Sequence, residues 1–212
     1  YYNPAGLTNL ETMEIIGNVY LSDTKLYYEG QGEHESSDTP LNYFPTFFTG
    51  GPVSDDGKLY WGFGAYAPFG LGTEWDDDDR MSYAAAEGNI QLVNLNPSLA
   101  YRLFDNLSIG AGIDYYISKA TLMQRPTGPM GTTEVEVEGT GEGLGYNLGV
   151  QWDVSSVLTL GMTYRSPVEV DYDGDIEIDP PVPPGMEGDA ETSIEYPSFV
   201  SLGAAWEATP RL

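Results

Sequence analysis

Few residues in this chain could carry covalent chemistry. His34 is the single His among 212 residues, and Cys is absent. A Ser-His-Asp hydrolase needs a His next to its nucleophile, and a catalytic cysteine or a thiolate metal site needs Cys. His34 lies in an acidic stretch that we expect to be a loop. We therefore predict no enzyme, no catalytic residue and no cofactor.

Carboxylates are abundant and could in principle bind Ca²⁺. They gather in WDDDDR (Trp75 to Arg80) and VDYDGDIEID (Val170 to Asp179). Calcium loops supply oxygen ligands at defined intervals, and neither run has the spacing of an EF-hand loop. Solvated surface loops explain both runs better, so no metal site is expected.

The overall charge narrows the class of partner. The chain has 33 acidic and 8 basic residues, for a formal net charge of -25. Such a surface repels nucleic acid, which we exclude as a partner. No apolar run reaches about 18 residues, which excludes transmembrane helices but leaves transmembrane strands open. The absence of Cys does not identify the compartment.

The elements that must position any site are strands. The chain is rich in Gly (26) and Tyr (16), a composition typical of β structure. Between residues 107 and 118, apolar side chains alternate with Ser, Gly and Asp, and period two indicates a strand. The same pattern predicts eight strands, at 13–28, 43–51, 59–69, 93–103, 107–118, 144–152, 158–165 and 200–206.

The connections between these strands alternate in length. Short turns are predicted at 54–57, 105–106, 153–156 and 207–210, and long acidic loops at about 29–42, 70–89, 126–134 and 179–190. Short turns at one end and long loops at the other are typical of an up-and-down antiparallel barrel in an outer membrane. The fold class is therefore all-β.

The tryptophans suggest which face meets the apolar phase. Trp61, Trp152 and Trp206 lie near short turns and share the apolar parity of their strands. Trp collects at the lipid–water boundary, so the apolar face is predicted to point outward into lipid. Phe69, Tyr115, Tyr172 and Tyr196 would form the opposite girdle. A soluble β-sandwich or lipocalin-like barrel, with the apolar face inside, is the alternative.

Five stretches resemble the FadL/TodX family of outer-membrane transporters for long-chain fatty acids and other hydrophobic compounds. They are YYNPAGLTNL (Tyr1 to Leu10), GFGAYAPFGLGTEW (Gly62 to Trp75), YRLFDNLSIGAGIDYY (Tyr101 to Tyr116), GYNLGVQWDVSSVLTLGMTYRSPV (Gly145 to Val168) and YPSFVSLGAAWEATPRL (Tyr196 to Leu212). Together they cover most of the chain in the order of the family.

The resemblance implies a barrel of about fourteen antiparallel strands plugged by an N-terminal hatch. Residues 1–11 would be the end of the hatch, and residues 12–212 would be barrel strands with long extracellular loops. Eight strands would make only part of such a barrel, so we expect a fragment of a longer protein, with a shortened relative as the alternative. The bacterial outer membrane, its lipid and lipopolysaccharide, and a monomeric state are expected with this fold.

The resemblance and the residue types together predict the sites. Asn3, Pro4, Ala5 and Gly6 can hold a compact turn inside the lumen and would form the gate. The family resemblance implies a lateral opening at a kinked third strand, at Gly62, Phe63, Gly64 and Pro68. Ordinary turn and packing roles are the alternatives for both sets. Loop residues Met81, Tyr83 and Met130 are predicted to line a substrate groove.

The expected function is passive uptake of a hydrophobic molecule, a fatty acid or an aromatic hydrocarbon, across the outer membrane. The substrate would enter from outside and leave sideways into the lipid. The alternative is a structural or adhesive barrel that only presents its acidic loops.

Overall fold

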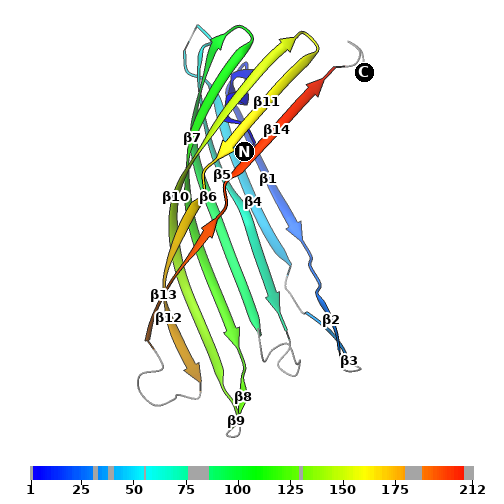
Figure 1. Ribbon diagram of the computed structural model, residues 1–212, viewed down its shortest axis with the longest axis vertical. Helices are drawn as coiled ribbons and strands as arrows, with labels where there is room; N and C mark the ends of the chain where they lie inside the picture. The colour runs from blue at the N-terminus through cyan, green and yellow to red at the C-terminus, as the bar shows by residue number, and fades with distance from the viewer. Residues whose placement is uncertain are drawn as a thin grey trace.

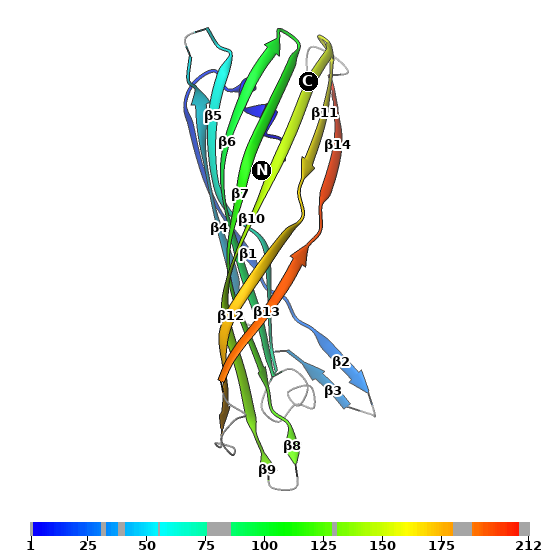
Figure 2. The same ribbon diagram turned by 60° about the vertical axis from the view of Figure 1, so that its left-hand side comes forward.

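The structure is a computed structural model that describes residues 2–30, 33–37, 41–54, 56–75, 86–128, 131–179 and 188–207. Its strands form one tall antiparallel sheet of ten strands and two small two-stranded sheets (Figure 1). A short 3₁₀ helix, η1, lies near the end that carries the short turns (Figure 2).

The chain forms one short helix and fourteen strands within the described residues. They are η1 (Pro4–Asn9), β1 (Glu14–Ser22), β2 (Tyr27–Gly30), β3 (Glu33–Ser36), β4 (Asn42–Pro52), β5 (Leu59–Glu74), β6 (Glu87–Phe104), β7 (Leu107–Gln124), β8 (Thr127–Gly128), β9 (Gly131–Thr132), β10 (Glu134–Ser155), β11 (Leu158–Arg165), β12 (Val168–Asp179), β13 (Gly188–Tyr196) and β14 (Phe199–Trp206).

The main sheet runs β1-β4-β5-β6-β7-β10-β11-β14, and β12 and β13 continue β11 and β14 beyond a break in each. The eight predicted strands are therefore confirmed. Three short turns lie where they were expected, between β4 and β5, β6 and β7, and β10 and β11, and the fourth lies outside the described residues. Strands extend into two of the ranges expected to be loops. In 70–89, β5 continues to Glu74, and in 126–134, β8 and β9 form a hairpin.

The two faces of the sheet have opposite polarity, and the polar face is the buried one. We call the face that η1 contacts the inner face. On β7 the inner-face Asp114 is 0% exposed, whereas the neighbouring outer-face Ile113 is 52% exposed. On β10, Asn147 is 2% exposed and Leu148 is 47% exposed. Apolar side chains facing outward identify lipid as the surrounding phase and exclude the soluble alternative.

The outer face also marks where the lipid ends. Along β10 its outward residues are apolar from Trp152 to Leu144 and then become Glu142, Thr140, Glu138, Glu136 and Glu134. On β7 the outward Ile117 is followed by Lys119, which pairs with Glu138 at 2.7 Å. The strands therefore continue beyond the apolar band toward the long loops, and their outer face there is charged.

The stretch that joins β11 to β12 contains one residue more than the part of β10 opposite it. Arg165 pairs with Asn147 and Asp171 pairs with Glu142, so the sequence advances by six residues on β11 and β12 but by five on β10. An extra residue reverses which side chains point inward. Tyr172 consequently faces inward and is 4% exposed, so its predicted place in the outer aromatic girdle is wrong.

Tyr196, another expected member of that girdle, packs against the inner cluster that contains Tyr172. The side chain of Phe69, the fourth expected member, lies outside the described part of the structure. Tyr115 keeps its predicted orientation and donates a hydrogen bond to Glu142 at 2.6 Å. Among the described residues, no helix is long and apolar enough to cross a membrane.

Candidate functional site

The segment around Asn3 is docked on the inner face by its own side chain. The side-chain Oδ1 of Asn3 accepts a hydrogen bond from the Ala5 backbone N–H at 2.9 Å and caps η1. The side-chain Nδ2 of Asn3 donates to the Val150 backbone carbonyl on β10 at 3.0 Å. Pro4 and Ala5 are buried, and Gly6 is half-buried. One side chain thus closes the turn and fastens it to the wall.

Further contacts fasten the other end of η1. The Thr8 hydroxyl bonds the Ser108 hydroxyl of β7 at 2.9 Å, and the amides of Asn9 and Gln151 exchange hydrogen bonds at 3.2 and 3.0 Å. Arg102 of β6 donates to the Thr8 carbonyl. These contacts hold the segment against three adjacent strands.

Glycines in the wall make room for this segment. A Cβ on Gly110 would lie 2.5 Å from the Ala5 nitrogen, and one on Gly62 would lie 2.7 Å from the Leu7 side chain. A Cβ on Gly149 would collide with the Asn3 side chain. The glycine-rich inner face is therefore a recess shaped for η1.

A cavity of about 240 Å³ lies between η1 and the inner face, and we call it the luminal cavity. Its apolar lining includes Leu7, Ile16 and Phe48, and neutral polar groups come from Thr49 and others. The complete lining is Asn3, Pro4, Gly6, Leu7, Leu10, Glu14, Ile16, Phe48, Thr49, Gly50, Gly62, Phe63, Gly64, Asn96, Ser98 and Asn147. The predicted gate residues and Gly62, Phe63 and Gly64 thus meet at one cavity.

The wall between β4 and β5 separates toward the long-loop end. The two strands pair from Pro52 to Phe47, whereas residues 42–46 of β4 pair only with β1 and residues 66–74 of β5 pair only with β6. The shift in β5 falls between Tyr66 and Phe69, at Ala67 and Pro68. Proline has no backbone N–H to offer a neighbouring strand.

This irregularity includes one of the residues predicted for the lateral opening, Pro68. The other three, Gly62, Phe63 and Gly64, lie where the wall is continuous, because they pair with β4 on one side and with β6 on the other. There Gly62 makes room for Leu7, and all three residues line the luminal cavity.

A second cavity of about 470 Å³ occupies the separation, and we call it the wall cavity. Phe44 and Tyr66 line it from the inner face, and Phe47 and Val93, each 41% exposed, line it from the outer face. Its lining thus comes from both faces of the sheet. Val93 pairs with Ile117, after which the outward residues of β7 become Lys119 and Thr121, so the wall cavity lies near the edge of the apolar band.

Two stacked rings stand between the cavities. Phe48 lines the luminal cavity and Tyr66 lines the wall cavity, and their ring centroids are 5.6 Å apart with an interplanar angle of 25°. Tyr66 is 4% exposed. Such a pair can separate two apolar spaces while offering an apolar surface to each.

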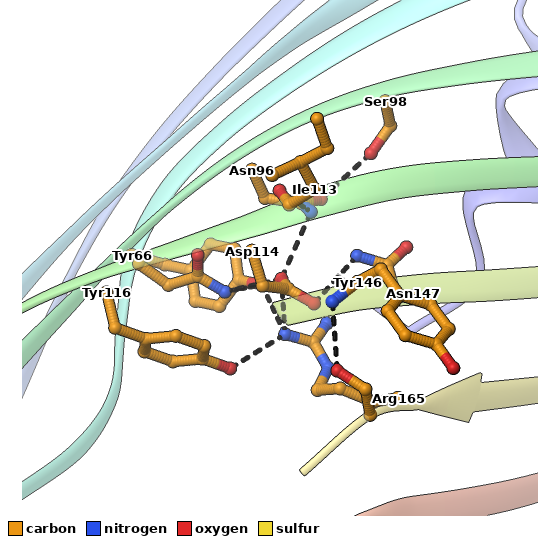
Figure 3. A network of polar contacts seen from close by, with 11 residues as sticks. Tyr66, Asn96, Ser98, Ile113, Asp114, Tyr116, Tyr146, Asn147 and Arg165 are labelled. Atoms are coloured by element: carbon orange, nitrogen blue, oxygen red, sulfur yellow. Dashed lines mark hydrogen bonds and ion pairs between the residues drawn. The ribbon is translucent and has the colours of Figure 1, made fainter. Parts of the chain in front are cut away.

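A buried polar network holds Tyr66 in place (Figure 3). Arg165 of β11 donates one N–H group toward the Tyr66 hydroxyl at 3.0 Å and toward Asp114 at 2.7 Å. Asn94 donates to the Tyr66 hydroxyl at 2.8 Å and to Asp114 at 2.6 Å. The network joins β5, β6, β7 and β11 across the inner face. Sequence reasoning missed it, although Asp114 was visible as a lone acid on the polar parity of its strand.

Toward the long loops the inner face becomes apolar. Leu92, Tyr116, Val168, Val170 and Tyr172 form a buried cluster there. The polar network therefore lies between this cluster and the luminal cavity.

Several predicted residues cannot be placed. Met81, Tyr83 and Met130, the expected substrate groove, lie outside the described residues. Within the described ranges, no group of three or more His, Asp or Glu side chains is arranged to hold a metal ion.

A tall antiparallel sheet with an apolar outer face, a polar inner face and a plug segment docked inside defines a transmembrane β-barrel wall of an outer-membrane protein. The chain belongs to the outer membrane protein transport protein family (OMPP1/FadL/TodX), because the model of this family matches residues 1–212.

Individual relatives agree with this assignment. The chain is 28% identical over 170 residues to a long-chain fatty acid transport protein of Escherichia coli O6:H1, covering 69% of this chain and 37% of that protein. It is 24% identical over 218 residues to outer membrane protein P1 of Haemophilus influenzae, covering 87% and 46%. The chain thus spans less than half the length of these relatives.

Solved structures share the fold. The Ralstonia pickettii toluene transporter TbuX superposes with a TM-score of 0.77 at 15% identity, covering 98% of this chain and 62% of that one. A Pseudomonas aeruginosa FadL homologue superposes with a TM-score of 0.75 at 17% identity, covering 99% and 60%. The predicted recognition, partial barrel fold and outer-membrane location are confirmed.

Proposed function

We propose that the protein takes up hydrophobic molecules across the outer membrane by passive diffusion. A molecule enters from the outside, passes the inner apolar cluster, occupies the luminal cavity and leaves sideways through the wall cavity into lipid. The wall cavity carries this proposal, because its lining residues come from both faces of the sheet. The names of the relatives, a fatty acid transport protein and a toluene transporter, agree with such a substrate class.

The gate in this proposal is the Asn3-Pro4-Ala5-Gly6 segment. It borders the luminal cavity and is held by a small number of hydrogen bonds, two of them from Asn3. Release of this segment widens the luminal cavity. Residues 1–11 act as the end of a hatch and residues 12–212 as barrel wall, in a monomer surrounded by lipid and lipopolysaccharide.

Uptake by the full-length protein tests the function. It is expressed in a bacterial strain that lacks its own transporter of this class, and uptake of a labelled fatty acid and a labelled alkylbenzene is measured against an empty vector. Uptake above the vector control is expected for at least one probe. Uptake equal to the control for both would leave only the structural or adhesive alternative.

A second experiment tests the lateral route. Ala67→Trp places a large side chain at the wall cavity and should reduce uptake, because Ala67 lines this cavity. Ala111→Trp, on the outer face of β7 away from both cavities, is the matched control. If both folded variants retain full uptake, the lateral route is wrong even though the protein transports.

A further inference from the structure

The buried carboxylate of Asp114 is the starting point for an inference about substrate charge. It is 0% exposed and accepts hydrogen bonds from Arg165 at 2.7 Å, Asn94 at 2.6 Å, Asn96 at 3.1 Å and Asn147 at 3.0 Å. Its donors come from β6, β10 and β11. A buried ion needs such partners, because water cannot solvate it.

The partner cation, Arg165, lines neither cavity but is linked by hydrogen bonds to residues that line both. Asn96 and Asn147, which contact Asp114, line the luminal cavity, and Tyr66, which contacts Arg165, lines the wall cavity. The Arg165 side chain is 11% exposed and donates toward Asp114, Tyr66 and the Tyr116 hydroxyl. A guanidinium in this place could attract the carboxylate of a substrate, but the charge of Arg165 is already paired with that of Asp114.

The rest of the described route has no cation to replace it. Among the residues that the structure describes, no Lys or Arg lines the luminal or the wall cavity, and the one charged lining residue is Glu14, an acid. A molecule that carries a carboxylate would lose its hydration here without gaining an opposite charge. An uncharged molecule has no such cost.

We propose that Asp114 is a specificity-determining residue that neutralises Arg165, so that the route takes uncharged hydrophobic molecules in preference to anionic ones. The inference rests on the proposed function. It assigns to Asp114 a role in selectivity beyond its structural role in the network.

Two probes with the same chain length separate charge from size. Dodecanol is neutral and dodecanoate is anionic at pH 8, and their uptake is measured in cells that carry the full-length protein. Wild type should take up dodecanol faster than dodecanoate. Asp114→Asn keeps the shape and exposes the Arg165 charge, so the dodecanol-to-dodecanoate ratio should fall about tenfold, equivalent to about 1.4 kcal/mol.

Matched variants distinguish selectivity from general damage. Glu142→Gln removes one carboxylate from the outer face of β10 and should leave the ratio unchanged. Asp114→Asn combined with Arg165→Gln removes both charges and should restore the wild-type ratio. Assembly of each variant is checked by the heat-dependent gel mobility of folded barrels.

Each outcome has a separate meaning. Wild-type preference for dodecanoate, or an unchanged ratio in folded Asp114→Asn, overturns the inference and leaves the proposed function standing. If Asp114→Asn does not fold, Asp114→Ser, which also removes the carboxylate and leaves Arg165 in place, takes its position in the assay, and an unchanged ratio again overturns the inference. If no variant takes up either probe, the proposed function itself is refuted, and the inference with it.

Discussion

Asn3→Ala is expected to release the docked segment from the wall. The substitution removes the bond from the Ala5 amide at 2.9 Å and the bond to the Val150 carbonyl at 3.0 Å. Only the second bond joins the segment to the wall, and such a bond contributes about 1 kcal/mol net, so docking weakens by about 1 kcal/mol. That loss raises the population of released segment about fivefold.

A thiol at position 7 can report this release, once any Cys elsewhere in the full-length protein has been replaced by Ser. The chain has no Cys, and the Leu7 side chain faces Gly62 inside the luminal cavity. With Leu7→Cys as background, the rate of modification by a polar maleimide follows the fraction of time that the segment is released. The rate is measured with and without Asn3→Ala in the full-length protein, assembled in detergent.

The control makes the same replacement at another asparagine. Asn106 donates to the Asp153 carbonyl at 3.4 Å in a short turn, so Asn106→Ala should not change the rate. Gly149→Ala should accelerate modification as Asn3→Ala does, because its Cβ would collide with the Asn3 side chain. A rate in Asn3→Ala equal to that of the control would refute Asn3 as the anchor.

Three further predictions concern stability, measured by denaturant unfolding of the full-length protein in lipid. Arg165→Met leaves a buried carboxylate unpaired and should cost about 3–5 kcal/mol, whereas Lys119→Met breaks an exposed pair and should cost at most about 1 kcal/mol; equal costs would contradict the network. Leu148→Arg places a charge in the lipid and should cost about 2–4 kcal/mol, against about 0–1 for Thr140→Arg near the interface, and similar values would contradict the outward apolar face. Burial, then the neighbouring glutamate of β5, raises the pKa of Glu87 above its usual range. Its ionised form is therefore disfavoured in the folded state, so Glu87→Gln should stabilise the protein above this raised pKa and lose the advantage below the ordinary pKa of glutamate; a gain that is independent of pH would contradict this.

The sequence was sufficient for the strands and for the direction of their faces. Period two is a local property, and a row of Gly, Ser and Asn beside a row of Leu, Ile and Tyr, with Trp near the short turns, favoured a wall with lipid outside over a soluble barrel. The docking of Asn3 was also partly readable, because Asn before Pro favours a capped turn.

The place where β4 and β5 separate was decided by pairing between strands. The sequence pointed to Pro68, but the extent of β4–β5 pairing, from Pro52 to Phe47, depends on the register of the two strands, which no local pattern reveals. A one-residue shift turned Tyr172 from the lipid toward the interior. Period-two reasoning fails at such a shift, since one extra residue reverses every later side chain.

The buried polar network was likewise determined in part by the sequence and in part by the tertiary structure. The sequence by itself determined that Asp114 lies on the inner parity of its strand, which singles it out as a charge inside the wall. Its partner Arg165 is 51 residues away, and only the order and tilt of the strands bring the two side chains to 2.7 Å. Tertiary structure decided this contact because a buried charge is stabilised by the groups that surround it in space, whatever their distance along the chain.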